Sequence, residues 1–315
     1  MEWHGRPYYS LNAFLKNTYG EKLYKIAVDA GFTCPNRDGT LGSGGCIFCS
    51  AGGSGEFAVK TADHPSVTDQ IETGLALFAH KRVGQRFIVY FQAYTNTYGP
   101  LPHLRALYTE ALRHPDVAGI SIATRPDCIT ENIVTMLVNL QQIFSDKFVW
   151  VELGLQTIHE KTADFLRRGY PLSVYDSCVG LLSQADIPVI THIIIGLPGE
   201  GEEALLSTID HLNQLGTWGV KLQLLHVLRD TAFAGYYHDG SYTPLARDAY
   251  IDLVIACLEH LSPDIVIHRL TGDGPKALLL APLWSLDKRS VLNTLHHTMK
   301  LRAACQGRLY ERHSS

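Results

Sequence analysis

Six short apolar runs rich in β-branched and aromatic residues recur along the chain, separated by segments with helical periodicity. The runs cover residues 23–28, 86–92, 119–123, 148–154, 187–195 and 219–228. Between them, apolar residues repeat at i, i+4 and i+7 in three stripes: Ile71, Leu75 and Phe78; Ile133, Leu137 and Leu140; and Leu205, Ile209 and Leu212. Nearly continuous apolar strands that alternate with helices predict a parallel sheet covered by helices.

This alternation predicts an α/β fold of six strand–helix units. Periodicity alone fits either a doubly wound sheet or an incomplete (β/α)6 barrel of the TIM type. The units occupy residues 23–261, with an N-terminal extension at 1–22 and a C-terminal extension at 262–315 that we expect to pack on the core. Thr130 and Ser173 are predicted helix N-caps.

Unusual polar and glycine-rich segments follow five of the predicted strands directly. They are CPNRDG (34–39), AYTNTYGP (93–100), TRPDC (124–128), LQT (155–157) and GLPGE (196–200). In both candidate folds the carboxyl ends of parallel strands meet at one edge, where ligands bind. We therefore expect these segments to form one site.

Composition narrows the class of protein without identifying it. The chain has 315 residues, 46% of them hydrophobic, and a net charge of −4, so no overall basic field indicates nucleic-acid binding. The N-terminal segment MEWHGRPYYS lacks the apolar core of a signal peptide, and no run of about 18 apolar residues would span a membrane. We expect a cytoplasmic protein with no membrane partner, in which clustered cysteines indicate metal or redox chemistry.

Three cysteines, Cys34, Cys46 and Cys49, lie in the loop after the first predicted strand. Unrelated buried thiols would rarely cluster among proline, glycine and aspartate. A structural zinc site needs four closed ligands; His64 could be the fourth, but nothing in the sequence singles it out. An iron–sulfur cluster with three thiolates instead leaves one iron open to an outside ligand. The glycines of this loop would let the backbone wrap closely around such a cofactor.

The loop, with Phe48 before its last cysteine, resembles the cysteine triplet of the radical S-adenosylmethionine (radical SAM) superfamily. The wide first spacing and the segments YFQAYTNTYGP, TRPDC, ELGLQT, RRGY, HIIIGLPGE and RLTGDGP resemble an uncharacterised bacterial group related to the catalytic subunit of Elongator. More distantly, the chain is similar to oxygen-independent coproporphyrinogen oxidase. The resemblance covers nearly the whole chain and implies the incomplete (β/α)6 barrel.

This resemblance implies two cofactors, a 4Fe-4S cluster on Cys34, Cys46 and Cys49, and S-adenosylmethionine on its open iron. Cleavage of the sulfonium would yield a 5′-deoxyadenosyl radical that abstracts hydrogen from the substrate. The positions that match cofactor-binding segments of the family are Tyr94, Thr95, Asn96, Gln156, Arg168 and His192. For Arg168 the neighbouring Arg167 is an alternative, and His192 could instead be a satisfied core histidine.

Substrate contacts are predicted with less support from the pattern. Arg269 and Asp273 stand in a glycine-rich turn that could close over a substrate, and Arg125 is a third candidate unless it pairs with Asp127. The candidates for a catalytic group are Tyr94, Cys128 and Asp273.

The similarity to Elongator, which modifies the wobble uridine of transfer RNA, makes a tRNA nucleoside the expected substrate. The basic C-terminal stretch fits an RNA backbone or a solvated helix face; its cations are Lys288, Arg289, Lys300, Arg302, Arg308 and Arg312. A reducing partner such as flavodoxin or ferredoxin is also expected. The alternatives are a radical enzyme acting on a small metabolite or tetrapyrrole, and a non-catalytic binding module stabilised by a metal.

Overall fold

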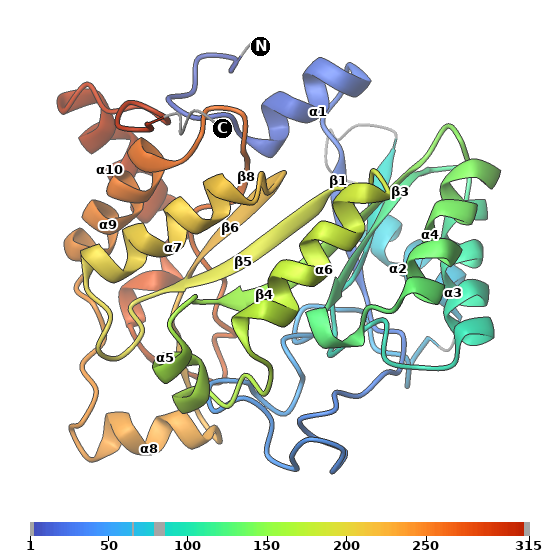
Figure 1. Ribbon diagram of the computed structural model, residues 1–315, viewed down its shortest axis with the longest axis horizontal. Coiled ribbons are helices and arrows are strands. Elements are labelled where there is room, and N and C mark those ends of the chain that lie inside the picture. Colours follow the sequence, from blue (N-terminus) through green and yellow to red (C-terminus); the bar gives the residue numbers. More distant parts are fainter. Residues whose placement is uncertain (1–2, 65, 79–85, 312–315) are drawn as a thin grey trace.

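The computed structural model describes residues 3–64, 66–78 and 86–311, and its main sheet has seven parallel strands. They are β1 (Tyr24–Val28), β2 (Phe87–Phe91), β3 (Val117–Thr124), β4 (Phe148–Gln156), β5 (Val189–Ile195), β6 (Gly219–Leu224) and β8 (Val266–Arg269), paired in that order. The sheet curls into a half-barrel, open between β1 and β8 (Figure 1). This confirms the α/β incomplete barrel expected from the sequence.

The seventh strand was not predicted, because β8 is only four residues long and half of it is polar. The predicted strand at 219–228 is in fact two strands. Its first part is β6, which pairs parallel with β5 and β8. Its end is β7 (Val227–Leu228), which turns away and pairs antiparallel with β9 (Leu279–Ala281).

Helices cover the outer face of the sheet and close one end of it (Figure 1). They are α1 (Leu11–Tyr19), α2 (Val67–Phe78), α3 (Leu101–Arg113), α4 (Glu131–Ile143), α5 (Glu160–Phe165), α6 (Leu172–Gln184), α7 (Glu202–Gln214), α8 (Ala232–His238), α9 (Arg247–His260) and α10 (Lys288–Leu301). The 3₁₀ turns are η1 (Pro126–Cys128) and η2 (Leu283–Leu286). Among the residues described, no helix combines the length and the apolar character that crossing a membrane requires.

The two predicted helix caps have different outcomes. Thr130 caps α4, because its hydroxyl accepts a hydrogen bond from the backbone N–H of Ile133 at 3.4 Å. The cap predicted at Ser173 is wrong, since α6 begins at Leu172 after Pro171. Proline fixes φ near the helical value, so the helix begins directly behind it.

The end of the half-barrel where the strands begin is closed by apolar and terminal segments. Leu15 of α1 packs with Phe148 and Trp150 in a buried aromatic cluster. In Figure 1 the N- and C-termini meet at this end, and the blue loop that carries the cysteines lies at the opposite edge. The carboxyl ends of the strands are therefore left for the site.

Candidate functional site

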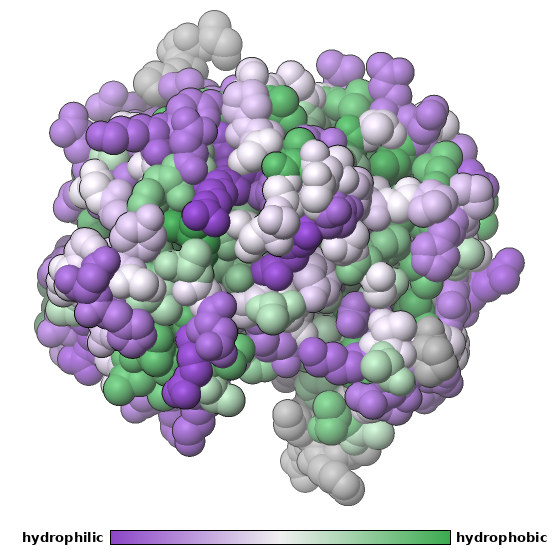
Figure 2. Space-filling view, turned by 90° about the horizontal axis from the view of Figure 1, so that it is seen from below, coloured by the Kyte–Doolittle hydropathy of each residue, from purple (hydrophilic) through white to green (hydrophobic). Residues whose placement is uncertain are grey.

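A cavity of about 270 Å³ opens at the carboxyl ends of the strands. Its walls come from the cysteine loop after β1, from the ends of β2 to β6, and from the segment that follows β8. Figure 2 shows this face, where hydrophilic residues lie across the middle and apolar residues form separate patches. One small-molecule site therefore collects residues from four of the five strand-end segments that the sequence pointed to, whereas GLPGE (196–200) contributes none to its lining.

Cys34, Cys46 and Cys49 all line this cavity and are partly buried. Their loop is folded by tight turns, one of them from the N–H of Cys49 to the carbonyl of Cys46 at 3.0 Å. Gly45 has φ +71°, a conformation that glycine adopts without strain. Among described residues, no group of three or more His, Cys, Asp or Glu converges on a single ion position. A four-iron cluster has separate corners, so its thiolates need not meet at one point.

Cationic and amide groups surround these thiols. Burial raises the pKa of the Cys46 thiol to about 11, although Arg125 and a hydrogen bond from Asn36 Nδ2, at 3.6 Å from Sγ, oppose that rise. Burial also raises the pKa of Cys49, and Arg37 opposes this. Guanidinium and amide donors stabilise thiolate sulfur, so the site suits thiolate ligands of iron. His64 lies elsewhere, 3.4 Å from the hydroxyl of Thr73.

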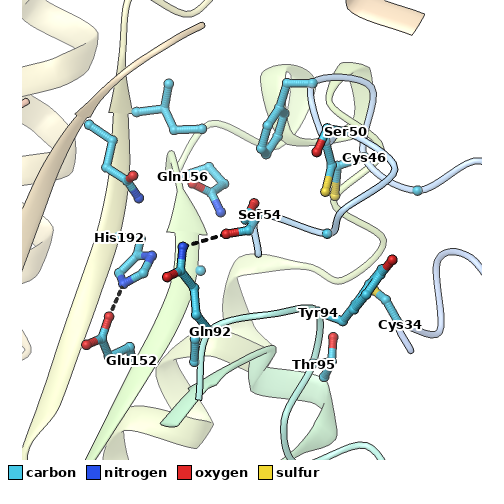
Figure 3. Close-up of a pocket in the computed structure, with 18 of the residues that line it drawn as sticks. Cys34, Cys46, Ser50, Ser54, Gln92, Tyr94, Thr95, Glu152, Gln156 and His192 are labelled. Atoms are coloured by element: carbon cyan, nitrogen blue, oxygen red, sulfur yellow. Dashed lines mark hydrogen bonds and ion pairs between the residues drawn. The ribbon is translucent and has the colours of Figure 1, made fainter. Parts of the chain in front are cut away.

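Tyr94 and Thr95 attach the cysteine loop to the end of β2. Tyr94 has φ +59°, and its hydroxyl donates to the carbonyl of Ala51 at 2.6 Å. Its ring covers Gly53 so closely that a Cβ there would lie 2.3 Å from a ring carbon. The N–H of Thr95 donates to the carbonyl of Thr33 at 3.2 Å. Both residues line the cavity (Figure 3).

Asn96 is completely buried between β2 and β3 and is not among the residues that line the cavity. Its side-chain nitrogen donates to the carbonyls of Phe91 at 3.1 Å and Ala123 at 2.9 Å. This carboxamide therefore holds the ends of two strands together.

Gln156 ends β4 at an irregularity in the pairing with β5, and its backbone φ is +69°. Its side chain lines the cavity, and the buried Oε1 has no hydrogen-bond partner in the described structure. An unpaired buried acceptor is costly unless a ligand supplies a donor. Gln156 therefore offers an unpaired acceptor for a ligand, as do Ser50 and Glu56, whose buried side-chain oxygens also lack a partner among the described residues.

Arg168 is 2% exposed, and its guanidinium forms hydrogen bonds within the protein. It donates to the carbonyls of Leu155 at 3.1 Å, Thr157 at 2.6 Å and Tyr170 at 3.0 Å, and to the Glu160 carboxylate at 3.1 Å. The side chain thus fixes the chain after β4 as a wall of the cavity.

The neighbouring Arg167 has φ +57° and does not line the cavity. Its carbonyl accepts from Asn36 Nδ2 at 2.8 Å, which fixes the position of the cysteine loop. Arg125 donates two hydrogen bonds to the carboxylate of Asp127, at 2.9 and 2.7 Å. This bidentate pair is the structural role that the sequence left open as the alternative to a substrate contact. Cys128 is buried outside the cavity lining, and burial raises the pKa of its thiol to about 12.

The floor of the cavity is a buried network around Glu152 of β4. Its carboxylate accepts from Lys25 Nζ at 2.6 Å, Ser121 Oγ at 2.6 Å, His192 Nε2 at 2.7 Å and the ammonium of Lys221. Burial alone would raise the pKa of Glu152, but Lys221 and Lys25 hold it well below its usual value. Burial, with Lys221, lowers the pKa of His192 to about 4. The network joins this carboxylate to two lysines and an imidazole. Burial lowers the pKa of Lys221 well below its usual value, and the Glu152 carboxylate opposes that shift.

Sequence reasoning missed Lys25 and Lys221. The available signal was a lysine inside an otherwise apolar strand, in YKIAV and GVKLQL. Such a lysine is placed at a sheet interior only if a carboxylate accompanies it.

Arg269 and Asp273 line the cavity beyond this floor. Both carboxylate oxygens of Asp273 accept from Lys288 Nζ, at 2.8 and 2.7 Å, and Arg269 Nη2 lies 3.7 Å from the same group. His226 is packed under the glycine-rich turn, since a Cβ on Gly272 would lie 2.8 Å from its ring. Burial lowers the pKa of His226 to about 4.

A cysteine loop over a cavity at the carboxyl edge of a half-barrel is suited to an enzyme whose chemistry belongs to a bound cluster. The sequence model of the radical SAM superfamily matches residues 34–212, and that of the radical SAM C-terminal domain matches residues 217–301. The chain therefore belongs to the radical SAM superfamily and is a radical SAM enzyme.

Two curated proteins and one solved structure show the nearer similarities. The chain is 40% identical over 307 residues to the protein YtqA of Bacillus subtilis, covering 98% of this chain and 94% of that one. It is 34% identical over 270 residues to YhcC of Escherichia coli K12, covering 86% and 85%. The archaeal Methanocaldococcus infernus Elp3 has the same fold, with a TM-score of 0.67 at 14% identity over 90% of this chain and 64% of that one.

Membership of this family implies a 4Fe-4S cluster and S-adenosylmethionine. When bound, the pair supplies reductive cleavage of a sulfonium bond, which starts radical chemistry on the substrate. The residues present fit that pair, because three thiols face one cavity beside guanidinium groups and Gln156 offers an unpaired acceptor.

Proposed function

We propose that this radical SAM enzyme modifies a nucleoside of transfer RNA, at the side chain of the wobble uridine. The observation that carries the radical part is the cavity shared by Cys34, Cys46 and Cys49 with polar residues from five strand ends. The tRNA part rests on the Elongator-like segments of the sequence. The fold shared with the archaeal Elp3 supports it.

In this proposal the three cysteines hold the cluster, and the opposite wall holds the cofactor and the substrate. Gln156 accepts a hydrogen bond from a cofactor hydroxyl, since its Oε1 is buried without a partner among the described residues. Thr95 completes the cofactor wall, and His192 lines the cavity on the side away from the cysteines (Figure 3). Arg168, Arg125 and Tyr94 keep the loops in register through the bonds already described.

The basic C-terminal stretch is a weaker candidate for the RNA contact than its sequence indicates. Arg302 pairs with Asp252 at 2.7 Å, and Arg308 is paired with Glu259. Arg312 lies outside the described residues. We infer instead that RNA approaches the face around the cavity mouth (Figure 2), because the target base must enter the cavity to react.

Electrons must reach the cluster from outside the protein. We propose a small reducing protein such as flavodoxin or ferredoxin as the donor, since the described chain has one group of cysteines suited to a cluster and no second such group.

Anaerobic reconstitution tests the radical part of this proposal. We expect the wild-type protein to take up iron and sulfide and to form 5′-deoxyadenosine from S-adenosylmethionine when a reductant is added. Cys34→Ala, Cys46→Ala and Cys49→Ala should each abolish both. Cys257→Ala is the matched control, because Cys257 is buried in α9 away from the cavity. Stoichiometric zinc in place of iron would contradict the proposal.

Nucleoside profiling tests the substrate. Transfer RNA from a strain that lacks the gene should lose or accumulate one modified wobble uridine, and the wild-type gene should restore the profile while a Cys46→Ala gene does not. A profile unchanged by the deletion would contradict the tRNA proposal and favour a small metabolite or tetrapyrrole.

A further inference from the structure

More basic than acidic side chains gather around the part of the cavity away from the cysteines. Three cations approach one another there, Lys25 from β1, Lys221 from β6 and Arg269 from β8, and each affects the titration of buried neighbours. Within the part of the chain that the structure describes, Glu152 is the single carboxylate that contacts both lysines. Asp273, the other nearby acid, forms its hydrogen bonds with a fourth cation, Lys288.

Among these three cations, Arg269 is the one whose guanidinium makes no hydrogen bond in the described structure. Its Nη2 lies 3.7 Å from Asp273, beyond hydrogen-bond distance, and no other partner is found for it among the described residues. Its side chain is 32% exposed and lines the cavity. An arginine whose guanidinium is unpaired in a cavity can bind a carboxylate or phosphate with two parallel hydrogen bonds.

Lys221 supports this guanidinium from the floor. It is the register partner of Arg269 on the neighbouring strand, and His192 is the partner of Lys221 on the other side. The ammonium of Lys221 is buried against Glu152 and the Tyr90 hydroxyl, so it contributes charge more than a free donor. Lys25 and Lys221 share the one Glu152 carboxylate, and Arg269 brings a guanidinium beside them from the neighbouring strand.

This cationic end is distinct from the end that the cofactor needs. In Figure 3 the labelled cysteines lie on one side of the cavity and the His192–Glu152 pair on the other, with Gln92 and Gln156 between them. Arg269 belongs to the His192 side, because β8 pairs with β6 beside β5. A ligand that reaches Arg269 is thus across the cavity from the cysteines.

We propose that Arg269, supported by Lys221, binds an anionic group of the substrate, a carboxylate or a phosphate. This rests on the proposed function, because the substrate is taken to share the cavity with S-adenosylmethionine. The anion would orient the substrate so that the atom that reacts faces the cysteine side.

Binding of labelled inorganic phosphate to the reconstituted protein, measured by equilibrium dialysis at low ionic strength, tests this inference. We expect one phosphate per chain, weakened about tenfold or more in Arg269→Gln and less in Arg269→Lys, which keeps the charge without the fork. The matched control is Arg247→Gln, an exposed arginine that pairs with Asp248 outside the cavity. Iron content and circular dichroism show whether each variant is folded.

Competitors identify the source of the anion. If acetate displaces phosphate at similar concentration, the site binds a carboxylate; if only phosphate esters do so, it binds a phosphate; both results support the inference. Equal phosphate binding by wild type and Arg269→Gln would overturn it. Displacement of phosphate by S-adenosylmethionine would also overturn it, because the site would then belong to the cofactor carboxylate. Production of 5′-deoxyadenosine is measured separately, so that failure of the radical proposal can be told apart from failure of the anion-binding proposal.

Discussion

One carboxylate, that of Glu152, determines the charge state of the barrel interior. It accepts hydrogen bonds from the buried Lys221, from the partly buried Lys25 and from His192. An ion pair buried in this way does not by itself make the fold more stable than an apolar core would. Here the ion pair lies under a cavity that holds charged groups. Removing only one partner of such a pair destabilises the fold strongly, because the other charge is left buried without compensation.

We predict that Glu152→Gln lowers the free energy of unfolding by about 3–5 kcal/mol, because the buried Lys221 and the partly buried Lys25 lose their counter-charge. Urea unfolding of the apoprotein under reducing conditions, followed by circular dichroism, measures this. Asp252→Asn is the matched control: its partner Arg302 is exposed, so the change should stay within about 1 kcal/mol. A loss below about 1 kcal/mol in Glu152→Gln would mean that water in the cavity solvates the lysines.

Stability should also fall as the pH is lowered from about 6.5 towards 4. His192 and His226 have pKa values of about 4 in the folded protein, against 6.5 in an unfolded chain. The unfolded state therefore binds more protons in this range, and each histidine contributes up to roughly 3 kcal/mol of loss. Glu152 adds to the loss only below about 4.5, since its pKa is depressed.

Urea unfolding at pH 7, 6 and 5 measures this slope. His226→Gln should make it shallower, because one of the groups that gain a proton on unfolding is gone. Stability that stays level between pH 7 and pH 5 would show that these imidazoles are hydrated in the folded protein.

At the scale of elements, the close contact between helix α2 and strand β1 depends on a glycine. A Cβ on Gly74 of α2 would lie 2.4 Å from Cγ2 of Ile26 in β1. Helical glycine usually weakens a helix by about 1 kcal/mol relative to alanine, so the residue is retained for packing. Gly180 of α6 is also helical, but a Cβ there would meet nothing within 4 Å.

These two glycines give opposite predictions for one substitution. Gly74→Ala should destabilise the protein by about 1–3 kcal/mol through overpacking, and Gly180→Ala should stabilise it by about 0.5–1 kcal/mol. Thermal and urea unfolding of the two variants measure the difference. A stabilising Gly74→Ala would mean that α2 can move away from β1 at little cost.

The elements also show how far the sequence could be interpreted. Long apolar strands and i, i+4, i+7 stripes predicted six strands and their helices, because burial on both faces leaves a continuous signal. The short polar strand β8 left none. The strand-end rule located the cavity, but not the roles inside it. Nothing in RRGY indicates that Arg168 would meet three carbonyls, since those carbonyls depend on the irregular end of β4 and on the turns after it.

At the scale of the molecule, the two ends of the half-barrel have separate tasks. The carboxyl end carries the cavity, and the other end joins the two chain termini. Gln306 makes that junction: its Oε1 accepts from the N–H of Tyr9 at 2.8 Å, and its Nε2 donates to the carbonyls of Ser262 at 2.7 Å and Ile265 at 2.8 Å. Ser10 continues the junction as an isolated parallel bridge to Ile267 of β8.

We therefore predict that Gln306→Ala costs about 2–4 kcal/mol of stability, because it leaves the buried N–H of Tyr9 and the buried carbonyl of Ile265 without this partner and removes one of two bonds to the carbonyl of Ser262. Gln142→Ala on the exposed side of α4 is the matched control and should change stability by less than about 0.5 kcal/mol. Iron per folded chain and 5′-deoxyadenosine per iron should be unchanged in Gln306→Ala, since the cysteine loop lies at the opposite edge (Figure 1). Loss of iron without loss of stability would show that the two ends are coupled, and that the terminal segments are part of the cofactor site.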